Sequence, residues 1–236
     1  MRPAGHEARF TIGNAVALWL GAYVAALPLQ AVVIALLGQN GVEPDDWPTS
    51  TTVATVLCLW IPFVVGLMIL SRLRGGSSFR DDYRVRFRAV DLVGLPIGIV
   101  GQLLLVPLLY WPLSTLFPDT FDATKVEQRA NDLWEQASGP WILALVAVVA
   151  VGAPLIEEFV YRGVIQQALE ARLNDVVALI LSGAFFAAIH LQPVEFPGLF
   201  LIGVVFGLCW QRTGRLACPI LAHVGFNATG LLLVAI

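Results

Sequence analysis

The sequence has few charged residues for its length. Only 13% of the 236 residues are charged, whereas 58% are hydrophobic, and the mean hydropathy is +0.78. A soluble domain carries roughly 25% charged residues, so this composition argues against a cytosolic protein. Positive charge is also scarce, since the formal net charge is −3, and we expect no nucleic-acid partner. These absences indicate a protein of the lipid bilayer.

Cysteine is rare too. The three cysteines, Cys58, Cys209 and Cys218, all lie inside apolar runs and form no disulfide framework. We interpret them as small buried hydrophobic side chains, which leaves little support for a redox role or for zinc bound by cysteine.

What the sequence does contain is a series of charge-free runs. A helix needs roughly 20 apolar residues to cross the hydrocarbon core. Five runs meet this length, and two shorter ones form a predicted helical hairpin that turns at residues 192–195. The seven predicted spans are Phe10–Val42, Trp47–Ser71, Leu92–Pro118, Gln136–Ile156, Val176–Val194, Phe196–Gln211 and Leu216–Ile236. An eighth, interfacial helix is predicted around Gly163–Leu173, and an amphipathic helix is predicted on the outer face from Thr124 to about Gln136.

The basic residues orient these spans. With seven spans, 12 of the 14 basic residues fall on one side of the membrane, and only Lys125 and Arg129 fall on the other. Cytoplasmic loops carry an excess of Lys and Arg, so we expect the N-terminus in the cytoplasm and the C-terminus outside.

The first polar cluster closes the fourth run and holds two adjacent carboxylates. Neighbouring helical residues project about 100° apart, so Glu157 and Glu158 cannot share a helix face. Glu158 and Arg162 are four residues apart in the favourable acid-first order, which predicts an ion pair. Glu157 is then free to take a proton. The alternative is that the span ends at Ile156 and that these charges lie in water.

Two further polar positions are histidines in later spans. His190 lies late in the fifth run, and His223 lies in the last run with Asn227 four residues on, on the same helix face. A lone histidine in an apolar helix is usually a structural group. Here two separate spans each carry one, and Gly225 beside His223 favours close helix packing.

A carboxylate, two imidazoles and a carboxamide suit amide hydrolysis by activated water. Glu157 and His190 could hold and deprotonate the water, directly or through a metal ion. His223 and Asn227 could donate hydrogen bonds to the oxyanion. No His-Glu-x-x-His motif occurs, yet Glu157, His190 and His223 could together bind a divalent metal such as zinc, and their spacing leaves open whether they do.

Three motifs occur in order on successive apolar segments: Glu157-Glu158-x-x-x-Arg162, Phe186-x-x-x-His190 and His223-x-x-x-Asn227. Together they resemble the motifs of the CPBP intramembrane protease family, also called Abi, or CAAX protease and bacteriocin-processing. That family includes the Ras-converting CAAX endopeptidases.

The resemblance implies glutamate-dependent proteolysis inside the membrane by a metalloendopeptidase. It assigns the catalytic glutamate to Glu157, the water-orienting histidine to His190, and the oxyanion pair to His223 and Asn227. Supporting positions fall on Glu158, Arg162 and Phe186.

The sequence therefore predicts an all-α, polytopic protein of the bacterial cell membrane. Three spans and their loops occupy residues 1–140, and a catalytic core occupies residues 141–236. The expected substrate is a membrane-associated protein or peptide, of CAAX type or another type. The alternatives are a non-catalytic bacteriocin-immunity or scaffold protein and a proton-coupled transporter. A transporter would be expected to contain inverted repeats.

Overall fold

The structure is a computed structural model that describes residues 9–76 and 78–236, and every regular element in this part of the chain is helical. The all-α prediction is confirmed. Six helices are long and apolar enough to cross a membrane: Ile12–Leu36, Thr49–Arg74, Ala89–Leu116, Pro140–Glu170, Phe196–Thr213 and Ala217–Ala235. The fifth predicted span is a shorter apolar helix, α10 (Asp175–Ala188).

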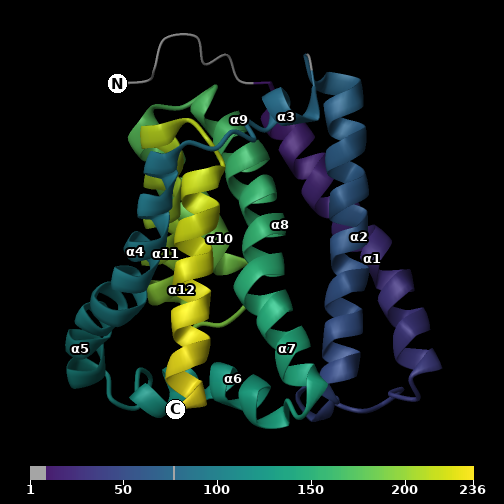
Figure 1. The fold of residues 1–236 in the computed structure, drawn as a ribbon, viewed down its shortest axis with the longest axis vertical. Coiled ribbons are helices and arrows are strands. Elements are labelled where there is room, and N and C mark those ends of the chain that lie inside the picture. The colour runs from purple at the N-terminus through teal and green to yellow at the C-terminus, as the bar shows by residue number, and fades with distance from the viewer. Residues whose placement is uncertain (1–8, 77) are drawn as a thin grey trace.

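The spans are arranged around the fourth one (Figure 1). On one side of it lie α1 (Ile12–Leu36) and α2 (Thr49–Arg74), which pack against each other. On the other side lie α4 (Gly94–Val100) and α5 (Val106–Leu116), joined by a π-helical segment, Gly101–Leu105. The last two spans are α11 (Phe196–Thr213) and α12 (Ala217–Ala235).

The short helices lie in the connections. A four-residue helix, α3 (Phe79–Asp82), follows α2, and a 3₁₀ turn, Ala89–Val93, leads into α4. On the opposite end, α6 (Ala123–Gln136) confirms the predicted helix. The end of α6 is tied to the start of α2, because the Thr49 hydroxyl donates to the Gln136 carbonyl at 3.1 Å.

The fourth span is one continuous helix of 31 residues, Pro140–Glu170. It consists of α7 (Pro140–Val146), a π segment (Ala147–Gly152), α8 (Ala153–Val160), a second π segment (Tyr161–Gln166) and α9 (Gln167–Glu170). The predicted separate helix at Gly163–Leu173 is therefore wrong, and so is a span that ends at Ile156. The helix continues because Glu158 and Arg162 pair inside the protein instead of marking an exit into water.

Proline explains the first π segment of this span. A π-helical amide donates to the carbonyl five residues back, as the Ala153 amide does to Val148. The next amide in that register would come from residue 154, which is a proline without an N–H. The carbonyl of Val149 is therefore left without its helical donor, about two turns before the glutamates.

The predicted hairpin is confirmed. The helices α10 and α11 pack closely, since a Cβ on Gly203 would lie 3.3 Å from the Cα of Gly183. Their connection, residues 189–195, is fixed by Tyr110 of α5, whose hydroxyl donates to the Val194 carbonyl at 2.7 Å and accepts from the Gly198 amide at 3.2 Å. This contact fixes the segment that follows α10 and contains His190.

Glycine also determines how closely α12 approaches α4. A Cβ on Gly98 would lie 1.9 Å from the Ala222 carbonyl oxygen, and a Cβ on Gly225 would lie 2.5 Å from the Leu95 carbonyl oxygen. The predicted role of Gly225 in close helix packing is confirmed. Since His223 lies between these contacts on α12, the packing of two backbones fixes its position.

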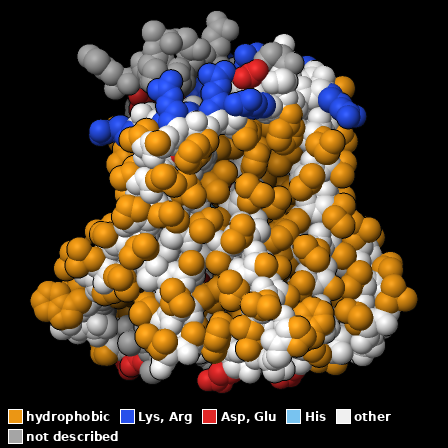
Figure 2. Space-filling model, viewed as in Figure 1, with side chains coloured by type: hydrophobic (Ala, Val, Ile, Leu, Met, Phe, Trp, Pro, Cys, Tyr) orange, Lys and Arg blue, Asp and Glu red, His pale blue; other side chains and the backbone are white. Residues whose placement is uncertain are grey.

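The surface separates apolar from charged side chains (Figure 2). Hydrophobic side chains cover the flank, Arg and Lys gather at the end where α2 finishes, and acidic side chains mark the other end. This distribution is expected of a membrane protein. The cytoplasmic placement of the N-terminus stays a prediction, and Arg2, on which it partly rests, lies outside the described residues. The division into residues 1–140 and a catalytic core of residues 141–236 also stays a prediction.

Candidate active site

The core of the candidate site is a buried carboxylate on α8. The Glu158 side chain is 0% exposed, and its Oε1 accepts a hydrogen bond from the Arg162 guanidinium at 3.1 Å. The predicted ion pair is confirmed. The same oxygen lies 2.9 Å from Nδ1 of His223, 65 residues further along the chain. Glu158 therefore connects the fourth span to α12.

Arg162 is held by more than its carboxylate partner. It is 0% exposed, and a second guanidinium nitrogen donates to the Gly203 carbonyl on α11 at 2.7 Å. Its charged carbon lies 4.9 Å from the ring centre of Phe186 and 5.6 Å from that of Phe206. Cation–π contacts of this kind stabilise a desolvated guanidinium. Glu158 and Arg162 thus form a neutral pair between aromatic rings.

His223 has two different environments at its two ring nitrogens. A carboxylate only accepts hydrogen bonds, so Nδ1 of His223 carries the hydrogen that points to Glu158. The opposite nitrogen, Nε2, lies 3.9 Å from Oε2 of Glu157. The ring stacks on Phe206 with centroids 4.6 Å apart and planes at 25°. Glu158 and Phe206 together fix the direction in which Nε2 points.

Glu157 is placed differently from its neighbour. Its side chain is 25% exposed, and its Oε2 has no hydrogen-bond partner among the described residues. The predicted difference between a paired Glu158 and a free Glu157 is confirmed. A separation of 3.9 Å exceeds a direct hydrogen bond and matches the span of one bridging water. Oε2 of Glu157 is itself buried, so a side chain must shift to admit that water.

His190 lies just after α10 and is half-buried. Its Nδ1 donates to the Phe186 carbonyl at 2.7 Å, which leaves Nε2 as the nitrogen available for a ligand. Its ring contacts that of Phe186 at 5.0 Å. In the described part of the chain, His190 makes no hydrogen bond or ion pair with Glu157. The structure therefore pairs Glu157 with His223 and not with His190.

Asn227 lies one turn after His223, as predicted, and one N–H of its side-chain amide is already used. It donates to the Val149 carbonyl at 2.8 Å, the carbonyl that Pro154 leaves without a helical donor. Asn227 therefore connects α12 to the fourth span about two turns before the glutamates. Among the described residues, the other amide N–H makes no hydrogen bond, so it is available to a ligand.

The predicted metal ligands do not form a three-ligand set. Within residues 9–76 and 78–236 there is no group of three or more His, Cys, Asp or Glu side chains that could hold a metal ion. Glu157 and His223 approach each other, whereas His190 binds a backbone carbonyl with one nitrogen. The donors as placed do not fit the site of three protein ligands expected for catalytic zinc.

Two parts of the site were not predicted. Phe206 stacks on His223 and lies over Arg162, and the carbonyl of Gly203 accepts from Arg162. The only sequence signal for both was the spacing of Gly203 and Gly207, which is typical of close helix packing.

Comparison with known proteins supports the same region. Residues 139–229 match the family model described as type II CAAX prenyl endopeptidase, Rce1-like. The predicted family resemblance is confirmed for this segment. It covers both glutamates, both histidines and Asn227.

Three relatives are similar to this chain. An uncharacterized 24.3 kDa protein of Escherichia coli is 27% identical over 149 residues, which is 58% of this chain and 69% of that protein. The putative membrane peptidase YdiL of Bacillus subtilis is 28% identical over 83 residues, 35% of this chain and 34% of the relative. The membrane-embedded CAAX protease MroQ of Staphylococcus aureus is 38% identical over 82 residues, 32% of this chain and 33% of the relative.

The chain thus spans only about a third of the length of the two named peptidases. No solved structure matches. The apolar helices and the bacterial membrane relatives together identify a bacterial integral membrane protein.

Proposed function

We propose that this protein is an intramembrane endopeptidase that hydrolyses a peptide bond with a water molecule held between Glu157 and His223. The observation that carries the proposal is the 3.9 Å gap between a partner-free carboxylate oxygen and an imidazole nitrogen, both inside a membrane protein. An unpaired ionisable group at such a place is energetically costly, and a function is the usual reason for its presence. The similarity to CAAX endopeptidases and to named membrane peptidases supports the same reaction class.

The proposed reaction uses both neighbours of the water. The water donates one hydrogen bond to Glu157 and one to Nε2 of His223, which turns an oxygen lone pair outward. That oxygen attacks the peptide carbonyl carbon while one of the two bases takes its proton. The C–N bond then breaks, and the same proton passes to the leaving amine, so no other reactant is consumed.

Glu158 acts through His223 in this scheme. Its carboxylate fixes the ring tautomer and stabilises the imidazolium that forms if Nε2 takes the proton, as the carboxylate does in a catalytic triad. The resulting Nε2–H can donate to the oxyanion of the tetrahedral intermediate. Arg162 in turn offsets the charge of the Glu158 carboxylate and donates a hydrogen bond to it.

His190 and Asn227 keep their predicted roles as part of the proposal. The free Nε2 of His190 suits a second acceptor that orients the water or the substrate. The second amide N–H of Asn227 suits an oxyanion donor, alongside its hydrogen bond to the Val149 carbonyl.

The predicted divalent metal, zinc, remains a prediction. The scheme above contains no step through a metal, because the described ligands do not fit a three-ligand zinc site as they are placed. Dialysis of the purified protein against a zinc chelator, followed by addition of zinc, tests the prediction. Loss and recovery of proteolysis would support zinc, and unchanged proteolysis would contradict it.

The decisive experiment compares peptide ends in membranes that contain the wild type or Glu157→Gln. We expect a set of cleaved ends to disappear in the variant, since loss of a general base lowers the rate by about 10²–10⁴-fold. His223→Gln should lose the same ends. Glu43→Gln is the matched control, because Glu43 is an exposed glutamate in the loop between α1 and α2.

Identical peptide ends in wild type and Glu157→Gln, with both proteins folded and equally abundant, would contradict the proposal. That outcome would favour the non-catalytic immunity or scaffold alternative. The substrate proposed here is a membrane-associated protein or peptide, and the same experiment would identify whether it is of CAAX type.

A further inference from the structure

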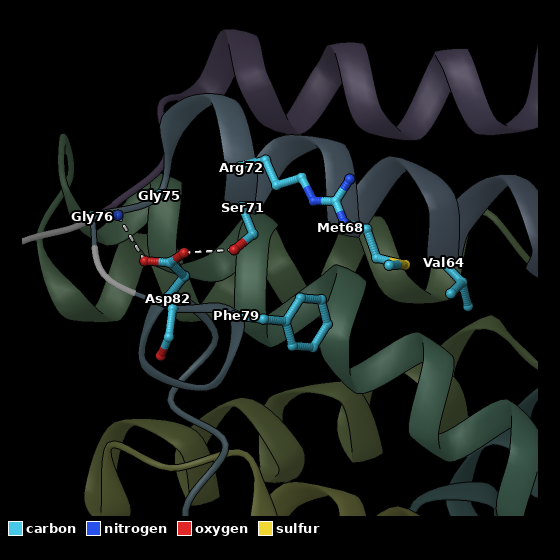
Figure 3. Close-up of a pocket in the computed structure, with 9 residues that line it drawn as sticks. Val64, Met68, Ser71, Arg72, Gly75, Gly76, Phe79 and Asp82 are labelled. Carbon is cyan, nitrogen blue, oxygen red and sulfur yellow. Dashed lines mark hydrogen bonds between the residues drawn. The ribbon is translucent and has the colours of Figure 1, made fainter.

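A second feature lies apart from the glutamates and histidines, where α2 ends. A groove of about 590 Å³ opens between the last three turns of α2, the following turn and α3. Figure 3 shows its lining: Val64, Met68 and Arg72 lie along α2, and the ring of Phe79 lies across from Met68 and Arg72. None of these residues takes part in the proposed hydrolysis.

The polarity of the groove changes along its length. Val64, Met68 and Arg72 are four residues apart, so they share one face of α2 and extend over about 12 Å along it. Val64 and Met68 are 40% and 43% exposed. The groove therefore has an apolar floor of two helical turns and a cation at the end where basic side chains gather on the surface (Figure 2).

The one carboxylate in the groove lining is already fully used. Asp82 is 1% exposed, and its two oxygens accept hydrogen bonds from the Ser71 hydroxyl at 2.6 Å and the Gly76 amide at 2.8 Å. Figure 3 shows these two bonds closing the turn after α2. Asp82 thus builds the wall of the groove and does not neutralise its cation.

Arg72 is the unpaired charge of the groove. Among the described residues it has no hydrogen bond or ion pair, and it is exposed at the end of the membrane-spanning helix. A cation at the headgroup level above an apolar trough is complementary to one chemistry, a phosphate group that carries an acyl chain. A soluble anion would match the cation but not the trough.

We propose that this groove binds one anionic phospholipid. Its phosphate contacts Arg72, and one acyl chain lies along Met68 and Val64 against Phe79. The ring of Phe79 also lies 5.6 Å from that of Phe159, which directly follows Glu158 in the chain. The bound lipid is therefore in contact, through one aromatic pair, with the helix that carries both glutamates.

The test uses purified protein in detergent with added phosphatidylglycerol, observed by native mass spectrometry. Wild type should retain one lipid molecule, and Arg72→Gln should bind it at least about fivefold more weakly, the effect of one interfacial cation. Arg74→Gln is the matched control, because Arg74 is in the same last turn of α2 but does not line this groove. It should bind like wild type, and inorganic phosphate should not displace the lipid.

A second variant tests the chain-binding part without touching a charge. Met68→Trp should fill the trough and weaken lipid retention, whereas Leu108→Trp, at an exposed site on α5 away from this face of α2, should not. Equal retention by Arg72→Gln and Arg74→Gln would overturn the proposal. Equal retention of phosphatidylethanolamine and phosphatidylglycerol by the wild type would also overturn it, since this would indicate non-specific lipid binding.

Discussion

Replacement of Glu158 by glutamine should destabilise the protein strongly. Glu158→Gln removes the negative charge beside Arg162, which is 0% exposed and cannot reach water. Loss of one partner of a buried ion pair costs about 3–5 kcal/mol, a large share of the 5–15 kcal/mol that stabilises a typical protein. For a chain of this size, that cost corresponds to a fall in melting temperature of about 6–20 °C.

Thermal unfolding in a mild detergent measures this effect, and a second substitution isolates its cause. Glu158→Gln with Arg162→Met removes both charges, so the double variant should be less destabilised than the sum of the two single variants. Asp81→Asn is the control, because its pair with Arg86 is exposed and should contribute little. Equal melting temperatures for wild type and Glu158→Gln would refute the proposed neutral pair.

Three further predictions follow from separate parts of the structure. Asn227→Ala should lower the free energy of unfolding by about 1–3 kcal/mol, because it leaves the Val149 carbonyl without a donor. The loss should be smaller in a Pro154→Ala background, where residue 154 regains a backbone N–H. Equal losses in the two backgrounds, measured by thermal unfolding, would contradict this role. Gly98→Ala should lower the free energy of unfolding by about 1–3 kcal/mol and reduce proteolysis, because the methyl group of the new alanine would push α12 away from α4. An unchanged free energy of unfolding would contradict the tight packing. The Arg86 hydrogen bond lowers the pKa of Asp81. The contact therefore stabilises the folded protein at pH values above the ordinary carboxyl pKa, and this stabilisation is lost as the pH falls through the lowered pKa of Asp81. Arg86→Gln should raise the pKa of Asp81 in an NMR titration.

Local patterns predicted local structure well. The hydrophobic runs located the spans, and the four-residue spacing of Glu158 and Arg162 predicted their ion pair. Both follow from helix geometry within one segment, which a single sequence contains. The hairpin of α10 and α11 was predicted for the same reason, because a polar break separates two short apolar runs.

Contacts between distant segments were predicted less well. The sequence indicated Glu157, His190 and His223 as one group, but it could not give their order in space. The pairing of Glu157 with His223 depends on how closely α12 packs against its neighbours, and His190 turns toward a carbonyl because α10 ends at Ala188. The continuation of the fourth span was missed for a related reason. The charge-free run ends at Ile156, and the groups that allow the charges beyond it to be buried lie on α11 and α12.

The burial of the fourth span also has a consequence for how the protein is made. This helix carries Glu157, Glu158 and Arg162, and ionisable side chains at mid-membrane cost about 2.5–3.5 kcal/mol each in an isolated helix. The Gly203 carbonyl, which accepts a hydrogen bond from Arg162, is synthesised 41 residues after Arg162. The His223 ring, which contacts Glu158, is synthesised 65 residues after Glu158. A ribosome therefore delivers the charged span before these two groups exist, and until the C-terminal helices arrive Glu158 and Arg162 have only their pair within the helix.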